Sequence, residues 1–444
     1  MSRPFLLVLF LVPFTPFSSL IAQGFTFTKV ADTSTAVPQG SGLFTAFSNM
    51  VSTDSSGDVA FSENNGGADD GIYLWSAGTI TRIAGTDTAV PAGMGTFTGF
   101  SFFGNGLEGG RVAFRGNSAG AAGVYAHDGV TLMRLADTST AIPDGMGSFS
   151  GFTTAYVDGT SYAFIAPGSM DQQGIYLHDG MSLSRIADKN STVPDIGGVY
   201  GWSSQLGFDA GNIAFWANVA GGTQGGNIVG GYTPGGGLVT LATTATTAPG
   251  TAAAFTSFTS PVDLSGTTVV FNGSYAGGSG IYTTDLAEGG ITRIASTTTA
   301  APGGGGNFTG FQVVSIANGA VAFVGSTGSG TGVYLFQEGI LRKVIATGNL
   351  LDGKTVTSLF ISENSLAEGS LAFRAHFADS SKGIYVAEVG EPVVPPSSTK
   401  AAQLKKEIKK ATAKLKLARK AGQVAKAKRF LAKLKKLKLQ LRRL

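Results

Sequence analysis

The sequence predicts an all-β fold: a seven-bladed β-propeller closed by an N-terminal strand, with a C-terminal α-helical basic tail. Three observations predict it. A repeat occurs seven times, the last copy lacks a strand that is found near the N-terminus, and residues 400–444 change abruptly in composition. Only 14% of the residues are charged, and the chain holds 66 glycines and 30 phenylalanines. This composition is typical of many short strands joined by tight turns.

A hydrophobic triplet ending in phenylalanine marks each copy of the repeat. The seven triplets end at Phe61, Phe114, Phe164, Phe215, Phe271, Phe323 and Phe373, which lie 50 to 56 residues apart. An aromatic pair precedes the triplet, while a Gly-aliphatic-Tyr motif and then a basic-aliphatic-Ala motif follow it. Each motif is short, alternates apolar residues and is bounded by glycine-containing turns, so each predicts one strand. Four antiparallel strands in about 50 residues make one propeller blade.

The two ends of the repeat region predict how the ring closes. The seventh copy ends at 385–387 without its basic-aliphatic-Ala strand, and a matching segment stands at residues 27–31. The residues that follow that segment, 32–38, nearly repeat residues 137–143, which come after the second blade. We therefore expect Thr28 to Ala31 to pair with the strand around Tyr385, because such pairing removes exposed sheet edges.

The register of the strands gives two further expectations. Because side chains alternate between the faces of a strand, each triplet phenylalanine should be buried between neighbouring blades. The arginines of the basic-aliphatic-Ala motif should have structural roles, stacking or pairing between blades, rather than converge on one pocket. These arginines are Arg82, Arg134, Arg185 and Arg293.

The N-terminus and the absence of cysteine predict the cellular location. Residues 1–22 have the pattern of a signal peptide, with Arg3 ahead of an apolar run from Phe5 to Val12 and Ala22 before the cleavage point. The alternative, a membrane anchor, needs about 20 apolar residues, which is longer than this run. We expect a secreted protein, extracellular or associated with the cell surface. The lack of any cysteine in an exported chain favours a bacterial origin.

The repeat also supports a resemblance to a known family. With its Gly and Ala-Phe positions, such as Gly110 and Ala113-Phe114, the chain resembles exported bacterial tandem-repeat β-propeller proteins. That family is described by N-x-x-G…A-F repeats and variable C-terminal anchors ("choice-of-anchor" type). The resemblance covers roughly residues 25–390; the family's Asn is mostly absent, and Asp54 stands in that position in the first copy. It implies location and architecture rather than an activity.

Motifs for catalysis or cofactor binding are missing from the sequence. His127 and His178 occupy the same hairpin position in adjacent repeats, and His376 has no histidine nearby in sequence, so no zinc-type spacing exists. No Gly-x-Ser-x-Gly elbow stands between a strand and a helix. Glycine runs such as 277–280 lack the strand-to-helix context of a phosphate loop. A Ser-His-Asp triad assembled by the fold stays open, since triads are defined by geometry. We predict no cofactor.

Paired carboxylates in the loops that join the second and third strands would lie on the face of the ring that also carries the crossings between blades. Asp69 and Asp70 form one such pair and are the only metal candidates, for calcium. A calcium site needs several converging oxygens, and neighbouring repeats have no carboxylate there. A solvated loop is therefore the favoured interpretation. The same face is the expected binding surface for an unknown glycan or protein.

After the propeller (23–390), a proline-rich linker (391–399) leads to a basic tail (400–444). The tail holds eighteen Lys or Arg and one acid, Glu407, whereas the mature body holds 27 acids and 13 bases. Apolar residues at steps of three and four predict an amphipathic helical hairpin or a coiled coil. The candidate surface-binding residues are Lys405, Lys406, Lys409, Lys410, Lys414, Lys416, Lys433, Lys435, Lys436, Lys438, Arg442 and Arg443.

Such a tail binds anionic polymers or lipids, and export makes nucleic acid an unsuitable physiological partner. We therefore expect a non-enzymatic, exported binding or scaffold protein whose tail attaches to an anionic polymer or lipid of the cell envelope. Two other roles remain open for the tail: it could be a solvated coiled-coil stalk or an element through which copies of the chain assemble. The alternative function is an extracellular propeller enzyme acting on polysaccharide, a glycosidase or lyase, which would show facing carboxylates about 5–10 Å apart in a pocket.

Overall fold

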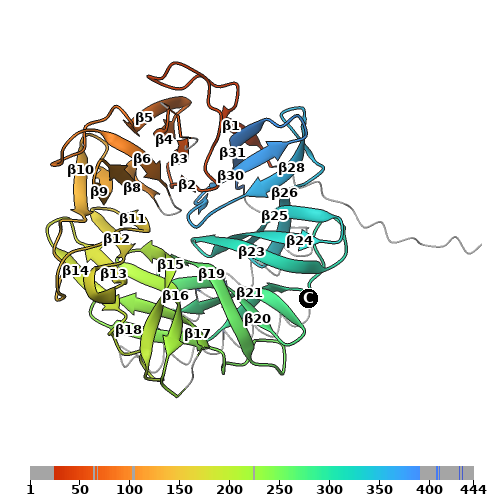
Figure 1. Ribbon diagram of the computed structural model, residues 1–444. Coiled ribbons are helices and arrows are strands. Elements are labelled where there is room, and N and C mark those ends of the chain that lie inside the picture. The colour runs from red at the N-terminus through yellow and green to blue at the C-terminus, as the bar shows by residue number, and fades with distance from the viewer. Residues whose placement is uncertain are drawn as a thin grey trace, which may run out of the picture. The chain divides into compact units, whose positions relative to one another are not determined.

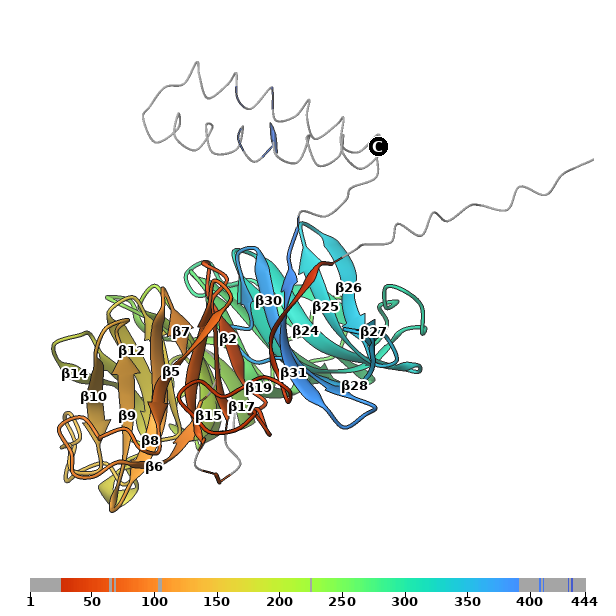
Figure 2. The same ribbon diagram turned by 90° about the horizontal axis from the view of Figure 1, so that it is seen from above.

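In the computed structural model, seven antiparallel sheets form the blades of a propeller around a central channel (Figure 1). The structure describes residues 25–63, 66–67, 69–102, 106–223 and 226–390, together with residues 407, 408, 410, 430 and 433. The chain divides into two compact units at Gly390. The strands of each blade run across the ring from one face to the other (Figure 2).

The first three blades follow one another along the chain. The first contains β2 (Val51–Thr53), β3 (Val59–Glu63), β4 (Gly71–Ser76) and β5 (Thr79–Gly85). The second contains β6 (Phe97–Ser101), β7 (Leu107–Glu108), β8 (Arg111–Ser118), β9 (Ala121–His127) and β10 (Leu132–Asp137). The third contains β11 (Thr154–Asp158), β12 (Ser161–Ala166), the 3-10 helix η1 (Ser169–Asp171), β13 (Gly174–His178) and β14 (Leu183–Asp188).

The next three blades are each formed by four consecutive strands. The fourth contains β15 (Val199–Asp209), β16 (Asn212–Ala220), β17 (Gly226–Thr233) and β18 (Gly237–Thr243). The fifth contains β19 (Phe255–Ser265), β20 (Thr268–Tyr275), β21 (Gly278–Asp285) and β22 (Thr292–Ser296). The sixth contains β23 (Phe308–Ala317), β24 (Ala320–Thr327), β25 (Gly330–Gln337) and β26 (Ile340–Ala346).

The seventh blade combines both ends of the repeat region, as the sequence predicts. Its strands are β27 (Leu350–Leu351), β28 (Lys354–Phe360), β29 (Leu366–Ala367), β30 (Ser370–Phe377), β31 (Lys382–Glu388) and β1 (Phe27–Asp32). β1 is antiparallel to β31, with Thr28 opposite Val386 and Lys29 opposite Tyr385. The prediction of ring closure is therefore confirmed, and β1 and β31 lie side by side in Figure 1.

Aromatic side chains fill the space between neighbouring blades. All seven triplet phenylalanines are buried, with at most 1% of their surface exposed, which confirms the predicted strand register. Phe114 of the second blade packs with Ala60 and Ile72 of the first. Within the second blade, Phe114 stacks on Tyr125, and Phe97 meets the same tyrosine edge-on with ring centroids 4.8 Å apart. Equivalent clusters recur in the first, third, fifth and sixth blades.

Two expectations about secondary structure differ from what is described. The aromatic pairs Phe44–Phe47 and Phe149–Phe152 lie before their innermost strands rather than within them, although all four rings are buried. The elements that the structure describes include no α-helix, so the predicted helical tail or coiled coil is not supported by them and stays a prediction. Of the tail, only residues 407, 408, 410, 430 and 433 are described, and each of these is in helical conformation.

Within the described residues, no helix has the length and apolar character needed to cross a membrane.

Candidate functional site

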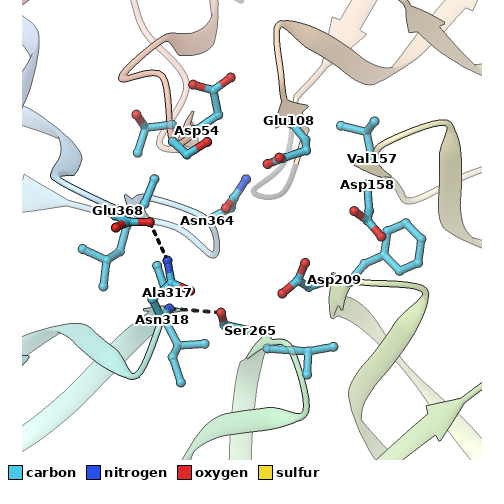
Figure 3. A pocket seen from close by; sticks show the side chains of 17 residues that line it. Asp54, Glu108, Val157, Asp158, Asp209, Ser265, Ala317, Asn318, Asn364 and Glu368 are labelled. Atoms are coloured by element: carbon cyan, nitrogen blue, oxygen red, sulfur yellow. Dashed lines mark hydrogen bonds between the residues drawn. The ribbon is translucent and has the colours of Figure 1, made fainter.

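A cavity of about 180 Å³ opens at one end of the central channel, and all seven blades contribute to its wall. We call it the channel mouth. Seven polar side chains, one from each blade, mark its rim: Asp54, Glu108, Asp158, Asp209, Ser265, Asn318 and Glu368 (Figure 3). Five of these seven are carboxylates, and no lysine, arginine or histidine lines the cavity. The channel mouth is therefore a site for positive charge.

The fold brings these seven side chains together because they occupy nearly the same place in each repeat. Each lies at or just after the end of the innermost strand, where the chain turns back into the second strand. Asp158, for example, ends β11, and Asp209 ends β15. Since the innermost strands of a propeller surround its axis, residues that are about 50 positions apart in sequence meet at the channel mouth.

Most of the rim side chains link one blade to the next through backbone N–H groups. Gly110 donates its N–H to Asp54 Oδ2 at 3.1 Å, and Gly211 donates to Asp158 Oδ2 at 2.9 Å. Gly211 is in the left-handed region, with φ 73°, a conformation that a glycine adopts without strain. The N–H of Gly266 likewise reaches Asp209.

The same linkage continues around the fifth, sixth and seventh blades, where Ser265 and Asn318 stand in place of a carboxylate. The N–H of Asn318 donates to Ser265 Oγ at 3.1 Å, and Asn318 Nδ2 donates to Glu368 Oε2 at 3.1 Å. Both bonds are visible in Figure 3. The rim therefore has a structural role as well as a negative charge, because each link joins two neighbouring blades.

Glu108 departs from this pattern. Its carboxylate makes no hydrogen bond and no ion pair within the described part of the chain, and it lines the cavity beside the other carboxylates (Figure 3). Burial raises the pKa of Glu108, and the charges of Asp54, Asp158 and Asp209 raise it further. Burial also raises the pKa of Asp158, to which the charge of Asp209 contributes. Like charges this close are stabilised by a cation.

A loop from the seventh blade fills the channel behind the mouth. We call residues 361–365, between β28 and β29, the plug. Asn364 Nδ2 donates to the carbonyl of Leu107 in the second blade at 2.9 Å and to Ser52 Oγ in the first at 3.0 Å. The Ser365 hydroxyl donates to the carbonyl of Val51 at 3.0 Å. The plug thus bonds to the first and second blades, and the N–H of Asn364 also reaches Asp263 Oδ2 of the fifth blade at 3.4 Å.

Two buried carboxylates lie in the channel interior. Asp263 accepts N–H groups from Leu264 at 2.8 Å and Ile316 at 2.9 Å, while burial raises its pKa to about 6. Glu363, in the plug, is 1% exposed, and neither of its carboxylate oxygens has a hydrogen-bond partner. Burial raises the pKa of Glu363 to about 8, with a smaller contribution from the charge of Asp263. At neutral pH the Glu363 side chain is therefore mostly protonated.

The metal candidates from the sequence lie away from the channel mouth. Asp70 accepts the N–H groups of Gly66 at 3.0 Å and Gly67 at 3.3 Å, and the Tyr73 hydroxyl donates to the carbonyl of Asp69 at 2.6 Å. These contacts shape the loop between β3 and β4. Among the described residues, no group of three or more His, Cys, Asp or Glu is placed to hold a metal ion.

The predicted surface-binding residues of the tail fall outside the described residues, except Lys410 and Lys433. Lys433 Nζ lies 3.9 Å from Glu407 Oε2. The structure therefore neither gathers these lysines and arginines into a surface nor separates them, and the tail's role stays a prediction.

The arginines of the basic-aliphatic-Ala motif are structural and do not converge on a pocket. Arg185 pairs with Asp188 at 2.7 Å, and Arg134 pairs in the same way with Asp137. Arg82 pairs with Asp87 at 2.7 Å. These aspartates belong to the start of the crossing to the next blade, so the ion pairs hold the crossings rather than bridge two sheets.

The acidic rim was not predicted from the sequence, because the adjacent carboxylate pair that stands out, Asp69 and Asp70, lies in a loop between a second and a third strand. The acids of the rim recur instead at the turn between the first and second strands of their blades. Glu108, Asp158 and Asp209 each stand six residues before a triplet phenylalanine, in three consecutive repeats. This spacing was a usable signal, since the closed ring places equivalent positions around one axis.

Solved structures that are similar to this chain share little sequence identity with it. The beta-propeller domain of the Trilobed protease from Pyrococcus furiosus is 9% identical, with a TM-score of 0.46, over 79% of this chain and 95% of that one. The GH74 xyloglucanase from Xanthomonas campestris is 14% identical, with a TM-score of 0.43, over 79% of this chain and 53% of that one. An uncharacterized protein from Listeria monocytogenes is 9% identical, with a TM-score of 0.40, over 79% and 96%.

No curated protein matches the sequence. Residues 18–399 match a family described as a family of unknown function (DUF7453).

Proposed function

We propose that this chain, which belongs to the family of unknown function (DUF7453), is a non-enzymatic binding protein that takes a cationic group at the channel mouth. One observation carries the proposal: Glu108 presents a carboxylate without a hydrogen-bond partner to a cavity that four further carboxylates line. A bound cation would offset the burial and the mutual repulsion that raise the pKa of Glu108.

The size of the cavity favours a single charged group over a large ligand. The channel mouth holds about 180 Å³, whereas pockets that enclose a whole small molecule are typically about 300–1,000 Å³. A lysine ammonium or an arginine guanidinium on a protruding peptide fits this volume and donates several hydrogen bonds to carboxylates. We therefore favour a basic peptide as the ligand, with one cationic side chain in the mouth.

Replacing Glu108 tests this function. In calorimetric titration of the full-length protein with a trilysine peptide at low salt, Glu108→Gln should weaken binding about tenfold, or about 1.4 kcal/mol. Glu388→Gln is the matched control, because Glu388 is exposed on β31 away from the cavity. Since the pKa of Glu108 is raised, wild-type binding should weaken as the pH falls through that raised value. Equal affinities of wild type and Glu108→Gln would refute the proposal.

Export and surface attachment complete the proposed function. Residues 1–22 would direct export, and the tail at 400–444, with eighteen bases and one acid, would hold the protein on an anionic envelope polymer or lipid in the manner of choice-of-anchor proteins. Attachment should then weaken as the Debye length falls from about 10 Å to about 3 Å between 0.1 M and 1 M salt. Deleting 400–444 should release the protein from cells, and continued attachment would favour an assembly role for the tail.

A glycosidase is the second candidate. A carboxyl group with a raised pKa beside ionised carboxylates is the arrangement that supplies a general acid and its partner, and Glu108 has that environment. Release of reducing ends from a polysaccharide panel, abolished in Glu108→Gln, would support the enzyme. Absence of turnover together with cation binding would support the binding protein.

A further inference from the structure

The sixth blade differs from the second, third and seventh blades at the position of the basic-aliphatic-Ala motif. In the second and third blades, Arg134 and Arg185 pair with an aspartate three residues later, Asp137 and Asp188. In the sixth blade the basic residue is Lys343, and the residue three positions later is Ala346. Within the described part of the chain, Lys343 has no ion pair and no hydrogen bond. Its ammonium group is therefore available for a ligand.

Lys343 lines a second cavity of about 180 Å³, formed by the sixth blade and the crossings on either side of it. Its wall also holds hydroxyl groups and glycines, and no Asp or Glu is among the lining residues. Thr347 Oγ1 accepts the N–H of Thr331 at 3.2 Å, which leaves its own hydrogen to donate. The Thr327 hydroxyl donates to the carbonyl of Gly330 at 3.1 Å and lies 3.1 Å from Ser329 Oγ, so it is not free for a ligand. The wall therefore combines one ammonium group with hydroxyl groups, in contrast to the carboxylates of the channel mouth.

The crossing that enters the sixth blade adds free backbone donors. Gly303, Gly304 and Gly305 have φ of 81°, 91° and 96°, and none of them forms a hydrogen bond within the described residues. In the equivalent crossings, Gly93 donates its N–H to Val90 at 3.1 Å and Gly145 donates to Ile142 at 3.1 Å. The glycine run of the sixth blade therefore leaves consecutive N–H groups unpaired and exposed, so they can donate to a ligand.

The cavity exists because three of its positions have no Cβ. A Cβ on Gly303 would lie 2.7 Å from Lys343 Nζ, and one on Gly305 would lie 2.4 Å from Ser329 Oγ. A Cβ on Gly330 would lie 2.4 Å from Thr347 Oγ1. Any other residue at these positions would displace the lysine or the hydroxyls. The glycines therefore allow the ammonium group of Lys343 and the hydroxyl groups of Ser329 and Thr347 to line the same cavity.

We propose that this cavity, which we call the oxyanion pocket, binds a small oxyanion such as a phosphate or carboxylate group. The ammonium of Lys343 supplies the charge, and the hydroxyls of Thr347 and Ser329 with the N–H groups of the glycine run supply hydrogen bonds. Charged donors of this kind bind oxyanions more strongly than neutral ones. The site is independent of the channel mouth, since the two cavities share no lining residue.

The blades themselves provide the decisive variant. Ala346→Asp restores the aspartate of the second and third blades, so its carboxylate should pair with Lys343 and repel an anion while the fold is kept. In calorimetric titrations of the full-length protein with inorganic phosphate and, separately, with glucuronate, Ala346→Asp and Lys343→Gln should each weaken binding about tenfold. Arg134→Gln is the matched control and should bind like the wild type, because Arg134 is already paired.

The two probes distinguish the sources of the oxyanion. Binding of phosphate alone identifies a phosphoryl ligand, and binding of glucuronate alone identifies an acidic sugar. A wild type that saturates with neither probe overturns the proposal. So does an Ala346→Asp or Lys343→Gln variant that binds like the wild type while its thermal unfolding is unchanged.

Discussion

The central channel carries carboxylates at two depths, at the mouth and in the interior. The carboxylates of the two groups differ in the number of N–H groups that they accept and in their pKa. At the mouth, Asp158 and Asp209 face a cavity and each accepts an N–H group from the next blade. In the interior, Asp263 accepts N–H groups from three residues, and Glu363 accepts none. Burial raises the pKa of Asp263 to about 6 and that of Glu363 to about 8. The N–H donors around Asp263 therefore keep it mostly ionised at neutral pH, whereas Glu363, which has no such donors, is mostly protonated.

This difference explains why the mouth is suited to a ligand and the interior is not. The interior carboxylates are buried, and the plug contacts the first, second and fifth blades around them. At the mouth, the link to the next blade uses one oxygen of Asp158, and Glu108 uses none. Acceptors therefore remain for a cation where solvent reaches them.

The largest expected effect is that of Glu363→Gln. The pKa of Glu363 is raised from 4.5 to about 8, so the native state binds this proton more tightly than the unfolded state. Its contribution to stability is full below about pH 4.5 and is lost as the pH rises to about 8. Glutamine removes this loss, so the variant should gain about 3–5 kcal/mol relative to wild type between pH 5 and pH 8.5. Urea unfolding at both pH values measures the difference.

The exposed Glu388→Gln serves as the control for that experiment and should leave the pH dependence unchanged. A Glu363→Gln variant that follows the wild-type stability curve from pH 5 to pH 8.5 would show that Glu363 is ionised in the native channel. The contrast between interior and mouth would then fail.

The next largest effect is a loss of stability, expected for Asp263→Ala. The N–H groups of Leu264, Ile316 and Asn364 would lose their common acceptor in a buried site. Each buried donor left unpaired costs about 1–3 kcal/mol, and removal of the buried charge offsets part of this cost. We expect a net loss of about 3 kcal/mol at pH 7, measured by urea unfolding. If Asp263→Ala lowers the free energy of unfolding less than Asp209→Ala does, Asp263 is not the main acceptor that stabilises the channel interior.

The smallest effect is expected for Asp209→Ala, which removes one link at the mouth. Only the N–H of Gly266 loses an acceptor, and solvent in the cavity replaces it. The expected loss is about 1 kcal/mol, together with weaker binding of the trilysine peptide. A loss as large as that of Asp263→Ala would mean that the rim, rather than the interior, fixes the angles between the blades.

The repeat allowed much of the fold to be predicted and only part of the site. Thr28 and Lys29 pair with β31 as expected, because a strand missing at one end and present at the other has one partner in a closed ring. Glu363 gave no such signal. Its burial results from a plug that contacts the first, second and fifth blades, and residues so distant in sequence leave no local pattern.

By itself, the sequence determined the number of blades, their four-stranded pattern and the burial of residues such as Phe114 and Tyr125, because alternation and turn chemistry are local properties of the chain. The tertiary structure decided which polar residues share a cavity. Glu108 meets Asp158 and Asp209 only after the ring closes around one axis, and Lys343 faces the glycine run only after the crossing folds over the sixth blade. Such convergence depends on the angle between neighbouring blades, which packing sets and local sequence does not encode.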